Sequence, residues 1–128
     1  YRRQRQMCIR DRAEAKDVTI SPADEDFLNK ALRFVEKNMD NSEYSVDELS
    51  DDMAMSRATL FRKMRSVIGM SPTDFIRNTR LKRAAQLITE GRLSVTEIAY
   101  SVGYSSPGHF TKSFKKEFGV LPTQYHKT

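Results

Sequence analysis

The chain has 128 residues, of which 38% are hydrophobic and 30% charged, and its formal net charge is +5. This length and apolar fraction fit one compact domain with a modest core. No apolar run approaches the roughly 18 residues that a membrane-spanning helix needs, and no apolar stretch follows the basic N-terminus as in a secretory signal. The lone Cys8 excludes an internal disulfide, so we expect a reducing, cytoplasmic location.

The charge is unevenly distributed along the chain. Residues 1–12 carry five Arg and one Asp, residues 13–52 hold four Lys or Arg against twelve Asp or Glu, and residues 53–128 hold thirteen against four. A positive segment of this size attracts a polyanion. The alternative is that these charges only solvate exposed helix faces, and charge alone does not decide between the two.

Residues 1–22 are expected to form a disordered tail and linker. The first twelve show no helical apolar period, and we interpret them as a non-native extension rather than a nucleic-acid-binding arm. A first helix is predicted to start at Pro22 or Ala23, with acidic residues 24–26 in the turn where the helix dipole favours negative charge. One apolar face of this helix is expected in the core.

Between residues 45 and 125 the sequence repeats itself at an offset of 49 to 50 residues. Each copy opens with a Ser that is followed three positions later by Glu, a capping box that starts a helix at Ser45 and Ser94. A second Ser in each copy, Ser56 or Ser106, caps a further helix that is basic. Two copies are too few for a solenoid, so each predicts a unit of helix, tight turn and second helix.

The second helix of each copy is predicted to be amphipathic. Its buried stripe is Leu60, Met64 and Ile68 in the first copy, and Phe110, Phe114 and Phe118 in the second. The major groove of B-DNA admits such a helix, whose outward side chains then meet base edges. The residues expected at bases are Ala58, Phe61, Arg62, Gly108, His109, Thr111 and Lys112. For His109, a phosphate contact and a plain surface position remain alternatives.

A second group of residues is expected to contact DNA phosphates, which contributes affinity but little sequence preference. The basic members of this group are Arg57, Lys63, Arg65, Lys115 and Lys116. The others stand at helix N-termini, where backbone N–H groups attract anions, and they are Ser45, Thr73, Ser94 and Thr123.

A long helix is predicted between the two copies, from Pro72 to about Glu90, with Gly91 as its stop signal. A rigid spacer of this kind would bring both second helices into successive major grooves on one side of a duplex, about 34 Å apart. The alternative is a central core helix, which is compatible with any function.

Three segments carry a family resemblance: residues 80–88 (RLKRAAQLI), 98–105 (IAYSVGYS) and 110–125 (FTKSFKKEFGVLPTQY). With them, the span from about Asp24 to Tyr125 resembles the DNA-binding domain of AraC/XylS-type transcription regulators. The resemblance implies an all-α domain of about seven helices over residues 23–128. It implies helix-turn-helix units at about 45–70 and 94–119, a linker helix at about 72–90, and base contacts by the outward residues of each second helix.

Residues 21–28 further resemble the entry to this domain in two-component response regulators and hybrid sensor kinases. The resemblance therefore implies an output module of a larger signal-responsive regulator. The partners it implies are double-stranded DNA, RNA polymerase, an upstream sensor or receiver domain, and a second copy joined through other regions. No cofactor or metal is expected, because the chain has two His, one Cys and no ligand spacing such as CxxC.

An enzyme is not expected either, since no histidine has an acid placed to orient it as a base. The competing hypothesis is a helical protein-interaction module that docks through its acidic first helix and lacks sequence-specific DNA binding. Salt dependence of binding to duplex DNA discriminates between the two hypotheses.

The sequence departs from the family pattern in both turns. Ser50 and Ala54 stand where relatives often have Ala and Gly. Because a non-glycine residue in a left-handed turn costs roughly 1–2 kcal/mol, we expect the first turn to take another shape. In the second copy Pro107 and Gly108 offer no polar side chain, so His109, Thr111 and Lys112 are expected to carry base recognition there.

Overall fold

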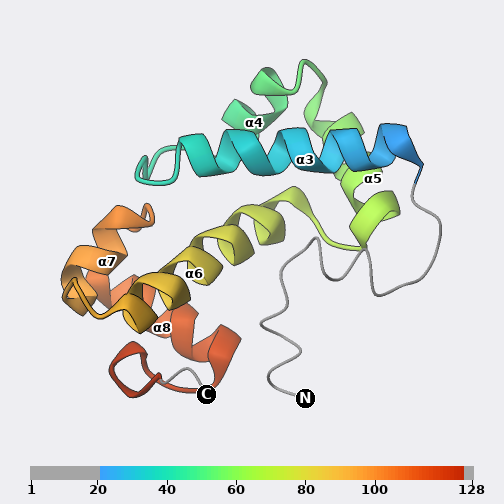
Figure 1. Cartoon of the computed structure of the whole chain (residues 1–128). Helices are drawn as coiled ribbons and strands as arrows, with labels where there is room; N and C mark the ends of the chain where they lie inside the picture. The colour runs from blue at the N-terminus through green and yellow to red at the C-terminus, as the bar shows by residue number, and fades with distance from the viewer. Residues whose placement is uncertain (1–20, 126–128) are drawn as a thin grey trace. The chain divides into compact units, whose positions relative to one another are not determined.

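Residues 21–125 are described by the computed structural model, and every regular element in that range is helical (Figure 1). The elements are α3 (Pro22–Lys37), α4 (Val46–Asp52), α5 (Arg57–Ile68), α6 (Pro72–Glu90), α7 (Val95–Ser101), α8 (Pro107–Phe118) and the short 3-10 helix η1 (Pro122–Gln124). The predicted all-α class is confirmed, and the six α-helices and one 3-10 helix of this range are close to the predicted seven.

The predicted tail, except for Ser21 and Pro22, lies outside the described residues. Within residues 21–125, no helix combines the length and apolar character that a bilayer crossing requires.

Serine residues cap the N-termini of most of these helices, as the sequence predicts. Ser56 Oγ accepts from the backbone N–H of Thr59 at 3.1 Å at the start of α5, and Ser106 Oγ accepts from that of His109 at 3.3 Å at the start of α8. Each hydroxyl satisfies one of the N–H groups that a helix leaves without an internal partner. These caps fix the residue at which each second helix begins, and so fix which side chains its first turn presents.

The described chain forms two compact bodies. The N-terminal body comprises residues 21–38 and 44–79, and the C-terminal body comprises residues 39–43 and 80–125. The helix α6 begins in the first body and ends in the second. Each body contains one of the two repeated units.

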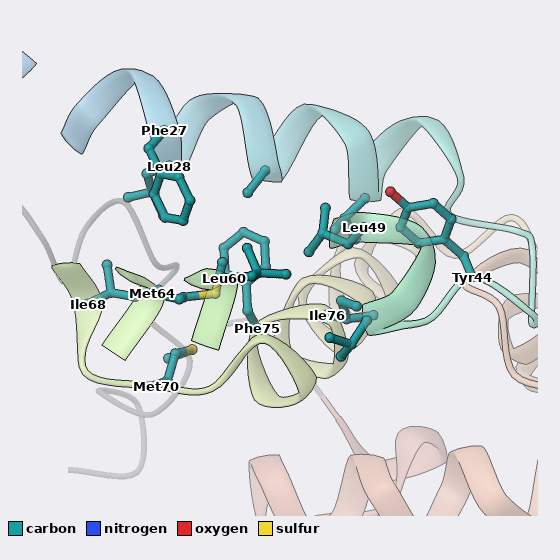
Figure 2. Close-up of a cluster of buried hydrophobic side chains, with 13 residues drawn as sticks. Phe27, Leu28, Tyr44, Leu49, Leu60, Met64, Ile68, Met70, Phe75 and Ile76 are labelled. Atoms are coloured by element: carbon teal, nitrogen blue, oxygen red, sulfur yellow. The ribbon is translucent and has the colours of Figure 1, made fainter. Parts of the chain in front are cut away.

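The core of the N-terminal body is a single cluster of apolar side chains (Figure 2). It draws Phe27 and Leu28 from α3, Leu49 from α4, Leu60, Met64 and Ile68 from α5, and Phe75 and Ile76 from the first part of α6. Leu60 and Met64 are fully buried, which for side chains of this size contributes roughly 1.5–3 kcal/mol each. The predicted inward stripe of α5 is confirmed.

The core of the C-terminal body is rich in aromatic rings. Phe114 lies 4.4 Å from Phe118 and 5.7 Å from Phe110 between ring centroids, and Tyr125 packs edge-on against Phe114 at 5.4 Å. Edge-to-face and offset pairs of this kind are favourable beyond the area they bury. The predicted inward stripe of α8 is therefore confirmed, and its rings form a continuous row of aromatic contacts in the core.

Candidate nucleic-acid interface

The turns of the two repeated units have the same backbone hydrogen bonds. In the first unit Met55 N–H donates to Ser50 O at 3.1 Å, and in the second Tyr104 N–H donates to Ala99 O at 3.0 Å. Both turns pass through one left-handed residue, Ala54 with φ 58° and Gly103 with φ 90°. Each unit is thus the predicted helix, tight turn and second helix.

The expectation that the first turn takes another shape is wrong. Ala54 adopts the left-handed conformation itself, and its exposed position leaves room for the methyl group. Ser50, buried where relatives often have Ala, satisfies its hydroxyl by donating to Asp47 O at 2.8 Å. The local strain of Ala54 is therefore tolerated, and the hydrogen bonds of the turn are retained.

The outward face of α5 is only partly as predicted. Ala58, Arg62 and Arg65 are exposed on the side away from the buried stripe. Phe61 is half-buried, because its ring packs against the edge of the N-terminal core. Arg62 is therefore the freely presented polar group in the middle of this face.

The guanidinium of Arg57 is held by two neighbours in the first unit. Its Nη1 lies 2.8 Å from Asp47 Oδ1, and its Cζ stands 5.6 Å from the centroid of the Phe61 ring. Asp47 was not predicted as part of the site. The second copy has Thr96 at the position equivalent to Asp47, before the turn. This difference between the two copies is the signal that the sequence offered for Asp47.

Lys63, like Arg57, has its cation over an aromatic ring. Its Nζ lies 5.3 Å from the centroid of the Phe27 ring on α3, a cation–π arrangement that draws the ammonium toward the core side of α5. To contact a phosphate, this side chain would have to leave that ring.

The outward face of α8 presents Gly108, His109 and Lys112, which are all exposed. Thr111 is half-buried, and its hydroxyl donates to Pro107 O at 2.9 Å, which leaves its methyl group and the acceptor capacity of its oxygen available. The His109 ring packs edge-on against Tyr104 at 5.4 Å, so its orientation is constrained by a buried neighbour. The predicted phosphate ligands Lys115 and Lys116 are exposed in the last turn.

The four residues predicted to contact phosphates at helix N-termini are of two kinds: two are helix caps and two are not. Ser45 and Ser94 form the predicted capping boxes, in which their N–H groups donate to the carboxylates of Glu48 and Glu97 at 2.9 Å. Hydrogen bonds from the Ser45 hydroxyl and backbone lower the pKa of Glu48 below its ordinary value. A phosphate at either start would compete with a carboxylate already bound there.

Thr73 and Thr123 are not helix caps. Thr73 is the second residue of α6, where the hydroxyl of Ser71 accepts from Asp74 N–H at 3.2 Å instead. Thr123 lies inside η1, which is preceded by Leu121. Both threonines are exposed, and their contact with phosphate stays a prediction.

The arrangement is suited to binding a polyanionic duplex. Two helices of matched geometry each present a cation at the equivalent position of the exposed face, Arg62 and Lys112. Further cations stand in the last turn of each helix. A helix with this pattern fits the width of the major groove, with central side chains at bases and flanking cations at phosphates.

Comparison with known proteins agrees with this geometry. A family of helix-turn-helix domains matches residues 49–128. The chain is 42% identical to histidine kinase P4 of Formosa agariphila over 85% of this chain and 8% of the kinase. It is 37% identical to the HTH-type transcriptional regulator MtrA of Neisseria gonorrhoeae over 88% of this chain and 38% of the regulator. The chain thus spans well under half the length of these relatives.

The solved structures that are similar to this chain agree with the sequence comparison. The C-terminal domain of AraT, a response regulator from Geobacillus stearothermophilus, has a TM-score of 0.73 and 28% identity over 84% of this chain and 86% of that domain. The DNA-binding domain of AdpA, solved in complex with a target DNA, has a TM-score of 0.70 and 26% identity over 77% and 87%. The chain is a helix-turn-helix domain. It belongs to the AraC-type family of transcription regulators.

Proposed function

We propose that this domain recognises a specific sequence in double-stranded DNA by inserting α5 and α8, its two recognition helices, into the major groove. The observation that carries the proposal is the equivalence of the two repeated units, whose turns have matching hydrogen bonds. Because Ser56 and Ser106 cap two recognition helices of equal length, Arg62 and Lys112 occupy the same position on them. A single positively charged surface would not need this duplication.

The recognition helices are proposed to use different chemistry at equivalent positions. The planar fork of Arg62 matches the O6 and N7 acceptors of guanine, whereas Lys112 acts as a point charge and discriminates less. The methyl groups of Ala58 and Thr111 suit contact with a thymine methyl. The exposed side chains of Arg65, Lys115 and Lys116 are proposed to neutralise phosphates.

Both recognition helices belong to one chain, so we propose that one molecule covers the whole DNA site. We propose that they enter successive major grooves on one side of the duplex, separated by about one helical turn of 10–10.5 base pairs. Because Arg62 and Lys112 differ, the two halves of the site would differ in sequence, and the site would be asymmetric.

In the cell, the domain is proposed to act as the output module of a longer cytoplasmic regulator, binding DNA without catalysing a reaction. Its similarity to a histidine kinase and to a response-regulator domain supports an upstream sensor or receiver as the source of the signal. RNA polymerase is the proposed target of the bound regulator, and a second copy, joined through other regions, is a further proposed partner.

Selection of binding sites from a random pool of duplexes tests the proposal. The expected product is an asymmetric site with two clusters of preferred bases about one helical turn apart. Affinity for the selected site should fall steeply with salt, with a slope that reports the number of neutralised phosphates. Enrichment of one cluster only would exclude a role for one recognition helix, and no affinity at low salt would favour the protein-interaction alternative.

A further inference from the structure

The side chain of Arg80 joins two backbone segments of the C-terminal body. From the middle of α6, its Nη1 donates to Gly103 O at 3.0 Å and its Nη2 donates to Asn41 O at 2.8 Å. Gly103 lies in the turn between α7 and α8, and Asn41 lies in the 39–43 segment that follows α3. One guanidinium therefore contacts the second helix-turn-helix turn and a segment more than sixty residues away from it.

The contact between Arg80 and the turn is close. A Cβ atom added at Gly103 would lie 2.7 Å from Arg80 Cζ and 2.5 Å from Met39 O. Gly103 is itself buried, and the Met39 side chain packs against the C-terminal core. The turn is thus enclosed by a guanidinium and a backbone carbonyl, which leaves it little freedom to shift.

The charge of Arg80 is partly withdrawn from water at this position. Burial lowers the pKa of its guanidinium from the ordinary value, although a guanidinium stays protonated in proteins. Charge-assisted hydrogen bonds to two carbonyls offset this loss of hydration, and the fixed fork geometry of Arg satisfies both at once. A lysine has a single ammonium on a flexible stem, so it would hold one carbonyl well and the other poorly.

We propose that Arg80 is a positioning residue for DNA recognition, which fixes the turn at Gly103 and thereby the direction in which α8 leaves it. The inference rests on the proposed use of α8 as a recognition helix. The first turn is built differently, because its left-handed residue, Ala54, is exposed. Loss of the Arg80 contacts should therefore impair the half of the site that α8 contacts and spare the half that α5 contacts.

The test compares Arg80→Met, Arg80→Lys and the control Arg83→Met in the 128-residue chain. Arg83 is an exposed cation on the same helix whose Nη1 donates to Gln86 Oε1 at 3.1 Å, so its replacement removes the same charge without touching the turn. The probe is the duplex that the unmodified chain selects from a random pool. Lys112→Ala identifies the half contacted by α8, and Arg62→Ala identifies the other half.

Arg80→Met is expected to weaken binding about tenfold and to flatten base preference in the α8 half only, at a temperature where circular dichroism reports a folded chain. Arg80→Lys should restore about a third of the lost affinity. Arg83→Met should keep the base preferences in both halves of the site. Equal loss in both halves, or intact preference in a folded Arg80→Met chain, would overturn the inference. If Arg80→Met does not fold, an Arg80→Lys chain with losses shared by both halves overturns it equally.

These results separate the inference from the proposed function. If the unmodified chain selects no two-part site, the use of two recognition helices fails, and the Arg80 inference fails with it. If it selects such a site and the Arg80 variants do not discriminate between its halves, only the inference about Arg80 fails.

Discussion

The two helix-turn-helix turns have the same backbone and different surroundings. Ala54 in the first turn is exposed, so its methyl group meets solvent and only the left-handed backbone is unfavourable. Gly103 in the second turn is buried against Met39 O and the Arg80 guanidinium, where a methyl group has no room. A residue at an equivalent position is thus constrained by conformation alone in one unit and by conformation and packing in the other.

The proposed recognition helices, α5 and α8, also differ in what surrounds their first residue. In the first unit, Arg57 at the start of α5 is held by Asp47 and the ring of Phe61. The equivalent position in α8 is Pro107, which carries no charge, while the phenylalanine rings of α8 pack against one another in the core. The first residue of α5 therefore has an ion pair and a cation–π contact at the surface, which the first residue of α8 cannot form.

The largest expected effect that separates the turns is that of Gly103→Ala. The substitution combines left-handed strain with the overlap on Met39 O, and we expect the free energy of unfolding to fall by about 3 kcal/mol. Gly91→Ala is the control, because Gly91 has φ 71° with nothing within 4 Å of an added Cβ, and should cost only about 1 kcal/mol. Urea unfolding followed by circular dichroism measures both, and similar losses would contradict the packing argument.

The next effect distinguishes the two proposed base contacts, Arg62 and Lys112. Arg62→Ala should cost about 1–3 kcal/mol on the selected duplex and relax preference at one position, whereas Lys112→Ala should cost less because a point charge discriminates weakly. Lys116→Ala should weaken selected and random duplexes alike. Fluorescence anisotropy titrations on both duplexes measure these losses. If Arg62→Ala and Lys116→Ala gave the same pattern, the division between base and phosphate contacts would be wrong.

A smaller, stabilising effect is expected in the first turn. Ala54→Gly removes the left-handed strain at an exposed site, and the greater chain entropy of glycine offsets part of the gain, so stability should rise by about 0.5–1 kcal/mol. Ala58→Gly, in the first turn of α5, should instead destabilise the chain by a similar amount. Thermal unfolding of both variants checks the opposite signs. A loss of stability in Ala54→Gly would show that the methyl group makes a contact of its own.

Local patterns in the sequence were sufficient to predict much of this fold. Helical spacing gave the buried stripes of α5 and α8, and the Ser and Gly signals gave the ends of most helices, because these depend on neighbours within a few positions. Ala54 was misjudged, since whether strain is tolerated depends on what surrounds the turn. Asp47 and Arg80 were missed as partners, because their contacts join residues 10, 23 and 39 positions apart.

The smallest effect concerns the ion pair that only the first unit has. Arg57 and Asp47 retain 58% and 66% of their side-chain exposure, so their pair contributes at most about 1 kcal/mol to stability. The pair also affects DNA binding, because the Asp47 carboxylate takes up Arg57 Nη1, which a phosphate would otherwise bind. Asp47→Asn should therefore strengthen binding to random duplexes a few-fold and steepen the salt dependence by up to about 0.9 in log–log slope, the contribution of one phosphate.

The charge-matched control for this last effect is Asp51→Asn. Asp51 is an exposed carboxylate one turn further along α4, so its replacement changes the net charge equally and leaves the Arg57 pair in place. If the carboxylate of Asp47 acts by holding Arg57, only Asp47→Asn steepens the slope. Equal slopes would mean that Asp47 acts through long-range repulsion of DNA alone, and the difference between the two units would then reduce to their net charge.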